Sequence, residues 1–353
     1  MPLWNSQASY NEDMDSADRE RYSRQILYRH IGEAGQERLL ASRAAIVGCG
    51  ALGSSQAALL ARAGVGELRI IDRDYVEQSN LQRQTLFDER DAAECLPKAV
   101  AAEEHLKQAN SRVRICGIVD DLTAENAAEL LGGMHVILDG TDNFETRYLI
   151  NDFAVKQGIP WVYGAAVGSY GATMTIVPGE TACLACLFPE PPTGMHTTCD
   201  TEGIIASAAS AVASIQAAEA LKLLVGDRQA LHRKLISFDV WENRFQAVDP
   251  SHPAEDCRVC GRREFVHLSG ERSVQITLCG RNSVQIHERR RPVDFAELEA
   301  RLQSLGSVRS NPFVMQFSVA PYEMTIFPDG RAIIKGTTDP GLARSLYARY
   351  IGT

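Results

Sequence analysis

The chain has 353 residues, of which 45% are hydrophobic and 23% charged, an ordinary composition for a globular protein with room for one large domain and a smaller one. Its formal net charge of −9 argues against a nucleic-acid partner that is bound through a basic face. Residues 1–25 lack the basic start and apolar core of a signal peptide, so we expect a cytoplasmic protein.

Helical and strand patterns alternate along the first half of the chain. After a polar start, residues 19–43 have the apolar spacing of a helix. The strands predicted next are 44–48, 67–72, 112–119, 135–140 and 160–168, and the helices between them are 51–63, 98–110, 124–133 and 144–158. Strands separated by helices indicate βαβ units with right-handed crossovers. We therefore predict a Rossmann-like, doubly wound α/β fold whose first half is a parallel sheet.

The pattern changes after residue 170. Segments 170–177 and 234–248 are predicted to be antiparallel strands that continue the sheet around a long helix at 203–225. The apolar run 203–215 contains three serines and continues into polar residues, so it is too short to span a membrane and is predicted to be a buried or subunit-contact helix.

The last part of the chain is predicted to form a small α+β domain. A hairpin at 273–287 precedes a helix at 294–306, strands at 313–319 and 323–336, and a closing helix at 339–351. The expected organisation is a flexible N-terminus (1–18), a main domain (19–262) and a C-terminal domain (265–353).

A glycine-rich loop, GCGALG, joins the first strand of the alternating region to its helix. Gly48, Gly50 and Gly53 allow a tight turn and close approach of the backbone to a phosphate at the helix N-terminus. An acid at the end of the next strand, Asp72, is placed to bind a ribose hydroxyl. These features fit NAD and ATP alike, and a structural turn is the third possibility.

Polar residues after Asp72 distinguish the two nucleotides. Asn80, Arg83 and Gln84 follow it in DRDYVEQSNLQRQ, and Lys98 opens a helix directly after Pro97. A triphosphate requires such cations and amide donors, whereas a nicotinamide site does not. The alternative for each of them is an ordinary solvated side chain.

Two carboxylates stand at the end of the fourth strand, in VILDGTDNFETR. Asp139 and Asp142 lie where open parallel sheets bind ligands, so we predict a magnesium ligand and assign it to Asp139. Asp142 and Asn143 either contact the nucleotide or cap the following helix.

Four of the nine cysteines form two Cys-x-x-Cys pairs, Cys183 with Cys186 and Cys257 with Cys260. In a reducing compartment this spacing predicts a closed four-thiolate zinc site, with a redox pair as the alternative. Cys199 lies outside the pairs, just before a predicted helix, and is either a reactive thiolate or an incidental loop thiol.

Together, RYSRQI, GCGALGS, DRDYVEQSNLQRQ, PKA, DGTDN, the two cysteine pairs and TTCDTEGI resemble the ThiF/MoeB/HesA family over residues 19–262. The resemblance implies a homodimeric adenylyltransferase that joins ATP to the C-terminal Gly-Gly carboxylate of a ubiquitin-like sulfur carrier of the ThiS or MoaD type, for thiamine thiazole or molybdopterin synthesis. It implies that the following residues contact ATP or its Mg²⁺: Gly50, Asp72, Asn80, Arg83, Lys98 and Asp139. It further implies that Arg24 reaches the phosphates from the other subunit and that Cys199 can receive the activated carrier.

Other functions compatible with these motifs are an NAD(P)-dependent oxidoreductase, adenylation of a small-molecule or tRNA-linked carboxylate, and a non-catalytic binding module. The oxidoreductase leaves Arg83, Lys98 and the four paired cysteines without a role. The role of the C-terminal domain is open between docking the carrier and completing the dimer.

Overall fold

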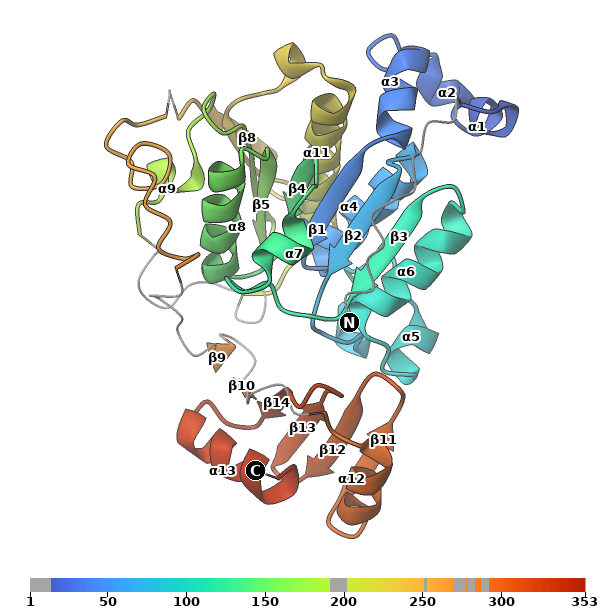
Figure 1. Cartoon of the computed structure of the whole chain (residues 1–353), viewed down its shortest axis with the longest axis vertical. Helices are drawn as coiled ribbons and strands as arrows, with labels where there is room; N and C mark the ends of the chain where they lie inside the picture. The colour runs from blue at the N-terminus through green and yellow to red at the C-terminus, as the bar shows by residue number, and fades with distance from the viewer. Residues whose placement is uncertain are drawn as a thin grey trace.

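A computed structural model describes residues 14–190, 202–250, 253–269, 277–278, 283–286 and 292–352 of the chain. Its larger part is built on one eight-stranded sheet with the strand order β3-β2-β1-β4-β5-β6-β7-β8 (Figure 1). The neighbouring strands from β3 to β5 run parallel, and those from β5 to β8 run antiparallel. The predicted parallel first half and antiparallel continuation are confirmed.

The strands of this sheet are β1 (Arg43–Val47), β2 (Glu67–Ile71), β3 (Arg114–Ile118), β4 (Val136–Asp139), β5 (Trp161–Val167), β6 (Tyr170–Ile176), β7 (Leu235–Asp239) and β8 (Arg244–Val248). The helices of this part are α1 (Ser16–Arg21), α2 (Ser23–Ile26), α3 (Gly32–Leu40), α4 (Ala51–Ala63), α5 (Glu89–Ala93), α6 (Lys98–Ala109), α7 (Ala127–Leu131), α8 (Phe144–Gln157), α9 (Leu184–Leu187) and α11 (Ala206–Val225), with short 3-10 turns η1 (Gln78–Asn80) and η2 (Arg228–Ala230).

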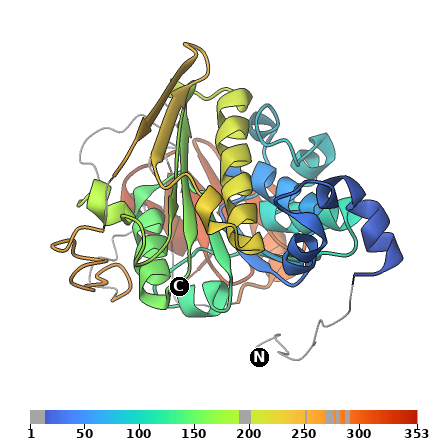
Figure 2. The same ribbon diagram turned by 90° about the horizontal axis from the view of Figure 1, so that it is seen from above.

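Helices cover both faces of the sheet (Figure 2). On one face, α3, α4, α6 and α11 close over a core that includes Ile46, Leu60 and Leu106. On the other face, α7, α8 and the cysteine-bearing segments pack around Trp161 and Tyr148. Because both faces of the central strands are buried, β1 and β4 are almost entirely apolar, as expected for a parallel sheet.

A second, smaller sheet has the order β11-β12-β13-β14-β10-β9 and is antiparallel throughout. Its strands are β9 (Thr277–Leu278), β10 (Ser283–Ile286), β11 (Ser307–Ser310), β12 (Met315–Val319), β13 (Tyr322–Ile326) and β14 (Ala332–Lys335), and its helices are α12 (Phe295–Leu302) and α13 (Pro340–Tyr350). The two helices and one face of this sheet share the core around Phe317 and Ile334. The predicted α+β character is confirmed, and the boundaries 1–18, 19–262 and 265–353 stay predictions.

Residues 19–43 differ from the single predicted helix. They form three short helices because Tyr22 ends α1 and the chain turns again before α3, where Gly32 has a positive φ of 61°. The long predicted helix at 203–225 is α11. It is long and apolar enough to cross a membrane by length and composition, and 56% of that window is buried inside the protein.

Candidate active site

The glycine loop lies at the C-terminal end of β1 and opens α4. Gly48 has a φ of 87°, and a Cβ on Gly53 would lie 1.8 Å from the carbonyl oxygen of Gly48, so only glycine fits there. A Cβ on Gly50 would meet only the side-chain nitrogen of Gln84, at 3.9 Å. Among the described residues, no side chain caps α4, which leaves the N–H groups of its first turn directed at this loop. The geometry is that of an anion-binding turn.

Asp72 ties the next strand to this loop. One carboxylate oxygen accepts from the backbone N–H of Cys49 at 2.6 Å, and the other from that of Asp74 at 2.7 Å. Burial raises the pKa of Asp72, and the positive charge of Lys98 opposes this rise. The ribose contact predicted for Asp72 stays a prediction.

Lys98 stands beside the same loop as a buried ammonium group. Its side chain is 3% exposed, and Nζ lies 3.1 Å from a carboxylate oxygen of Asp74. Hydrogen bonds connect Lys98 to the glycine loop, since its backbone N–H donates to the carbonyl of Asp74 at 2.8 Å and the N–H of Asp74 donates to Asp72, which binds the N–H of Cys49. Sequence reasoning missed Asp74 as its counter-ion, although the residue stands only two positions after Asp72.

The three polar residues of the NLQRQ segment differ in their burial and in their hydrogen-bond partners. Asn80 is buried, and its side chain accepts from the backbone N–H of Glu77 at 3.2 Å in a capping box. Arg83 is half-buried and donates to the carbonyl of Ser79 at 2.8 Å. Gln84 is buried, and its Oε1 has no hydrogen-bond partner in the described part of the chain. A buried amide oxygen without a partner, next to Gly50, is typical of a ligand site.

Asp139 is fully buried, and both of its carboxylate oxygens are occupied. Oδ1 accepts from the N–H and the hydroxyl of Thr141 at 2.9 and 2.7 Å. Oδ2 accepts from Nε of Arg147 at 3.0 Å and from the N–H of Gly164 at 3.3 Å. In this conformation Asp139 has no face open to a metal ion, so its geometry is that of a structural anchor and not of the magnesium ligand that we assigned to it.

Asp142 is the exposed carboxylate at this strand end. The N-cap of α8 is its neighbour Asn143, whose side chain accepts from the N–H of Thr146 at 2.9 Å. Asn143 does the capping, and its Nδ2 also donates to Oδ1 of Asp142 at 3.5 Å, but the Asp142 carboxylate is exposed and stays accessible to a ligand. The capping interpretation thus holds for Asn143, and Asp142 becomes the better candidate for magnesium.

Arg147 was not among the predicted site residues. It is buried, and besides Asp139 it donates to the carbonyl oxygens of Thr141 and Gly164 at 2.7 and 3.0 Å. It fixes the loop that presents Asp142. The only signal in the sequence was its position at the end of the segment DNFETR.

Arg24 lies away from the glycine loop of its own chain. Tyr22 packs against Gly64 and Gln25 donates to the carbonyl of Ala63, so α2 sits at the C-terminal end of α4, whereas the loop is at its N-terminal end. The 13 residues of α4 separate the two by about 20 Å. Arg24 is exposed there, beside exposed Leu27 and Tyr28.

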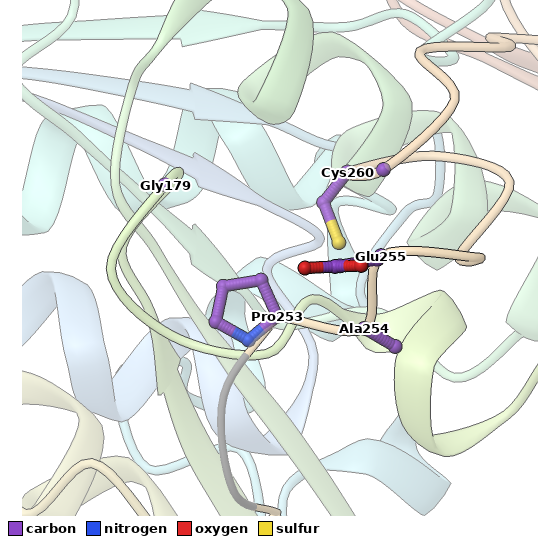
Figure 3. Close-up of a pocket in the computed structure, with 6 residues that line it drawn as sticks. Gly179, Pro253, Ala254, Glu255 and Cys260 are labelled. Carbon is purple, nitrogen blue, oxygen red and sulfur yellow. The ribbon is translucent and has the colours of Figure 1, made fainter.

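The four paired cysteines meet in one cluster. Their sulfur atoms all lie within 4.8 Å of one another, with Cys183 to Cys257 at 3.7 Å and Cys186 to Cys260 at 3.3 Å. Four thiolates at about 2.3 Å from a tetrahedral zinc ion would be about 3.8 Å apart, so the cluster fits zinc. A pocket of about 440 Å³ lies outside it, lined by Cys260, Glu255 and neighbouring residues (Figure 3), and none of its lining residues belongs to the glycine loop.

Cys199, predicted to be a reactive thiolate or an incidental thiol, lies outside the described residues.

Comparison with known proteins adds to this geometry. A sequence profile described as the ThiF family matches residues 22–259. The sulfur carrier protein ThiS adenylyltransferase of Bacillus subtilis (strain 168) is 47% identical over 336 residues, which cover 94% of this chain and 99% of that protein. The SAMP-activating enzyme E1 of Haloferax volcanii is 40% identical over 249 residues, which cover 70% of this chain and 91% of that protein. A crystal structure of E. coli MccB with ATP has a similar fold, with a TM-score of 0.60 and 23% identity over 68% of this chain and 74% of that one.

Proposed function

The chain belongs to the ThiF family, and from this premise we propose that it adenylates the C-terminal Gly-Gly carboxylate of a ubiquitin-like sulfur-carrier protein. ATP is the second substrate, and the products are the acyl-adenylate and pyrophosphate. A ThiS-type carrier, and with it thiamine thiazole synthesis, is favoured over a MoaD-type carrier, because the relative named for ThiS matches this chain over nearly its whole length.

One observation supports a nucleoside triphosphate more than any other. The buried ammonium group of Lys98 stands beside an uncapped helix N-terminus and a loop that only glycine can form. Burying a lysine is costly unless an anion compensates its charge. Asp74 does so here, and a phosphate group would provide a second anion. A nicotinamide enzyme would use the glycine loop and Asp72 but would have no need of this cation.

The chemistry requires charge compensation more than a general base. A terminal carboxylate has a pKa near ~3.5 and is therefore already ionised at neutral pH. Its attack on the α-phosphorus is opposed by repulsion between two anions. Lys98, Arg83 and the N-terminus of α4 would reduce that repulsion and hold the leaving pyrophosphate. A magnesium ion, which we propose to be held by Asp142, would supply further positive charge at the phosphates.

A second copy of the chain is part of the proposal. Arg24 lies about 20 Å from its own glycine loop, so it can reach phosphate only in the site of a partner subunit. The exposed apolar side chains Leu27 and Tyr28 next to it are suited to a subunit contact. The four-cysteine cluster is proposed to hold a structural zinc ion, because four thiolates leave no coordination position open for a substrate.

The proposed function is tested by ATP–pyrophosphate exchange with purified ThiS-type and MoaD-type carriers. Exchange should depend on the carrier and should disappear when its terminal glycine is removed. Exchange that survives without the terminal glycine, or with a free carboxylic acid alone, would contradict the carrier assignment. Turnover of NADH or NADPH without any exchange would favour the oxidoreductase.

A further inference from the structure

The C-terminal sheet lies against the main domain (Figure 1), and several of its polar side chains bond to that domain. The side chains on it that bond to the main domain come from four strands, β10, β12, β13 and β14: Gln285, Gln316, Thr325 and Lys335. Their partners lie in residues 73–77, at Cys95 and at Asp121. Residues 73–77 and 119–121 directly follow the C-terminal ends of β2 and β3, which is the edge of the sheet that carries the candidate nucleotide site.

Arg73 is the centre of this contact. Its Nη1 donates to the carboxylate of Asp121 at 2.8 Å and to Oε1 of Gln285 at 2.7 Å. The amide nitrogen of Gln285 donates in turn to the other oxygen of Asp121 at 2.6 Å. The three side chains form a closed and nearly buried ring, to which the C-terminal domain contributes one member.

A short path leads from this ring to the predicted nucleotide residues. Nε of Arg73 lies 3.8 Å from one carboxylate oxygen of Asp74, whose other oxygen lies 3.1 Å from the ammonium group of Lys98. The backbone N–H of Asp74 donates to Asp72. Burial lowers the pKa of Arg73, but the charges of Asp121, Asp74 and Asp142 outweigh burial and raise it.

A second attachment holds the same segment a few residues further on. Nζ of Lys335 donates to the hydroxyl of Tyr75 at 2.8 Å and also pairs with Glu77. Thr325 donates to the same tyrosine hydroxyl at 3.3 Å. The C-terminal domain thus holds Arg73, Tyr75 and Glu77 directly, and it holds Asn80 through the capping box that Glu77 forms.

Apolar contacts dock the domain independently of these polar groups. Val314, Phe327 and Ile333 form a small core with Cys95 and Val119 of the main domain. A buried ion pair at an interface often contributes less stability than apolar side chains of the same size. It forms, however, only when its two partners are held in one relative position. The apolar cluster therefore explains docking, whereas the polar ring defines where residues 73–80 lie.

We propose that the C-terminal domain is a positioning part of the nucleotide site, in which Gln285 and Lys335 hold residues 73–80 so that Asp72, Asn80 and Lys98 face the nucleotide. This inference rests on the proposed function, because it assigns the nucleotide to that site. Gln285 acts through Arg73 and Asp74 and does not touch the substrate.

The experiment compares Gln285→Ala with Gln303→Ala in the full-length chain. Gln303 is an exposed glutamine at the end of α12, in the same domain but away from the interface. Pyrophosphate exchange gives KM for ATP and kcat, and calorimetry gives Kd for ATP without the carrier. We expect Gln285→Ala to raise KM and Kd for ATP about 10-fold with little change in kcat, because a hydrogen bond to a charged group is lost. Gln303→Ala should match the wild type.

An exchange of the acid and the amide separates positioning from folding. Gln285→Glu alone places two carboxylates against each other, and Asp121→Asn alone removes the nearer of the two carboxylates that pair with Arg73. The two combined give Arg73 one carboxylate and one amide oxygen again, so KM for ATP should return toward the wild-type value. A purely structural role would lower the folded fraction, and with it the apparent kcat, without changing KM.

The results separate this inference from the proposed function. If the wild type exchanges pyrophosphate and Gln285→Ala keeps the wild-type KM and Kd for ATP, the inference is wrong and the function stands. If the wild type binds ATP but catalyses no exchange, the proposed function is wrong, and Kd for ATP in the variants still tests the inference. A wild type that does not bind ATP overturns both.

Discussion

Replacing Lys98 by methionine tests the candidate site most directly. The substitution removes the ammonium group and keeps a side chain of similar length at the start of α6. In the structure Nζ lies 3.1 Å from Asp74, with Lys98 3% and Asp74 17% exposed. The variant therefore loses one buried cation, and the partly buried carboxylate of Asp74 keeps Arg73 as a cationic neighbour at 3.8 Å.

The expected loss of activity follows from one charge-assisted hydrogen bond. Such a bond contributes about 1.5–3 kcal/mol, and each 1.36 kcal/mol corresponds to a tenfold change in rate. We therefore expect kcat/KM for ATP to fall about 10- to 150-fold in Lys98→Met. Breaking a fully buried ion pair costs about 3–5 kcal/mol of stability. The loss should be smaller here, because Asp74 keeps Arg73 as a partner and reaches solvent.

Pyrophosphate exchange and thermal unfolding are measured together in four proteins. They are the wild type, Lys98→Met, Lys98→Met combined with Asp74→Asn, and Lys107→Met. Lys107 lies on the same helix but is exposed, so its substitution controls for the loss of a lysine from α6. The double variant also removes the carboxylate that has lost Lys98 and should regain stability without regaining activity. Unchanged exchange in a folded Lys98→Met protein would remove Lys98 from the site and refute the reasoning.

Three further predictions concern the metal ions and the glycine loop. Asp142→Asn should keep the melting temperature and raise the magnesium concentration needed for exchange. Asp139→Asn should lower the melting temperature, because Arg147 loses its carboxylate partner. The opposite pattern would assign magnesium to Asp139. Gly53→Ala should fail to give folded protein, since a Cβ there would lie 1.8 Å from the carbonyl oxygen of Gly48, and circular dichroism of the purified variant checks this. The purified protein should contain one zinc ion per chain by elemental analysis, and its removal by a chelator should lower the melting temperature; a metal-free protein of unchanged stability would speak for redox cysteines.

The alternation of strands and helices was predictable because it depends on local spacing. Each βαβ unit has its own apolar strand and its own helix, and most connections are short, the exception being the segment between β2 and α6. Residues 19–43 were predicted less well, because apolar spacing does not reveal where Tyr22 and Gly32 turn the chain. The glycine loop was located correctly, since the steric requirement at Gly53 is met within a few residues of sequence.

Most of the site depends on contacts that are distant in sequence. Asp139 and Asp142 are three positions apart, and the sequence alone does not distinguish their roles. They differ because Gly164, from another strand, and Arg147, from the following helix, occupy Asp139. Gln285 meets Arg73 across 212 residues, and no local pattern indicates that contact.

The sequence by itself determined the class of fold, the glycine-rich turn after β1 and the four cysteines that cluster, because hydrophobic periodicity, glycine sterics and Cys-x-x-Cys spacing all act over short stretches of chain. Tertiary structure alone decided which of the two carboxylates is buried and which is exposed, and which end of α4 lies beside α2 with Arg24. It also decided that the C-terminal domain lies against the segment that follows β2. The physical reason is that burial and hydrogen-bond partners belong to a position in space, and residues that share such a position are brought together only when the sheets assemble.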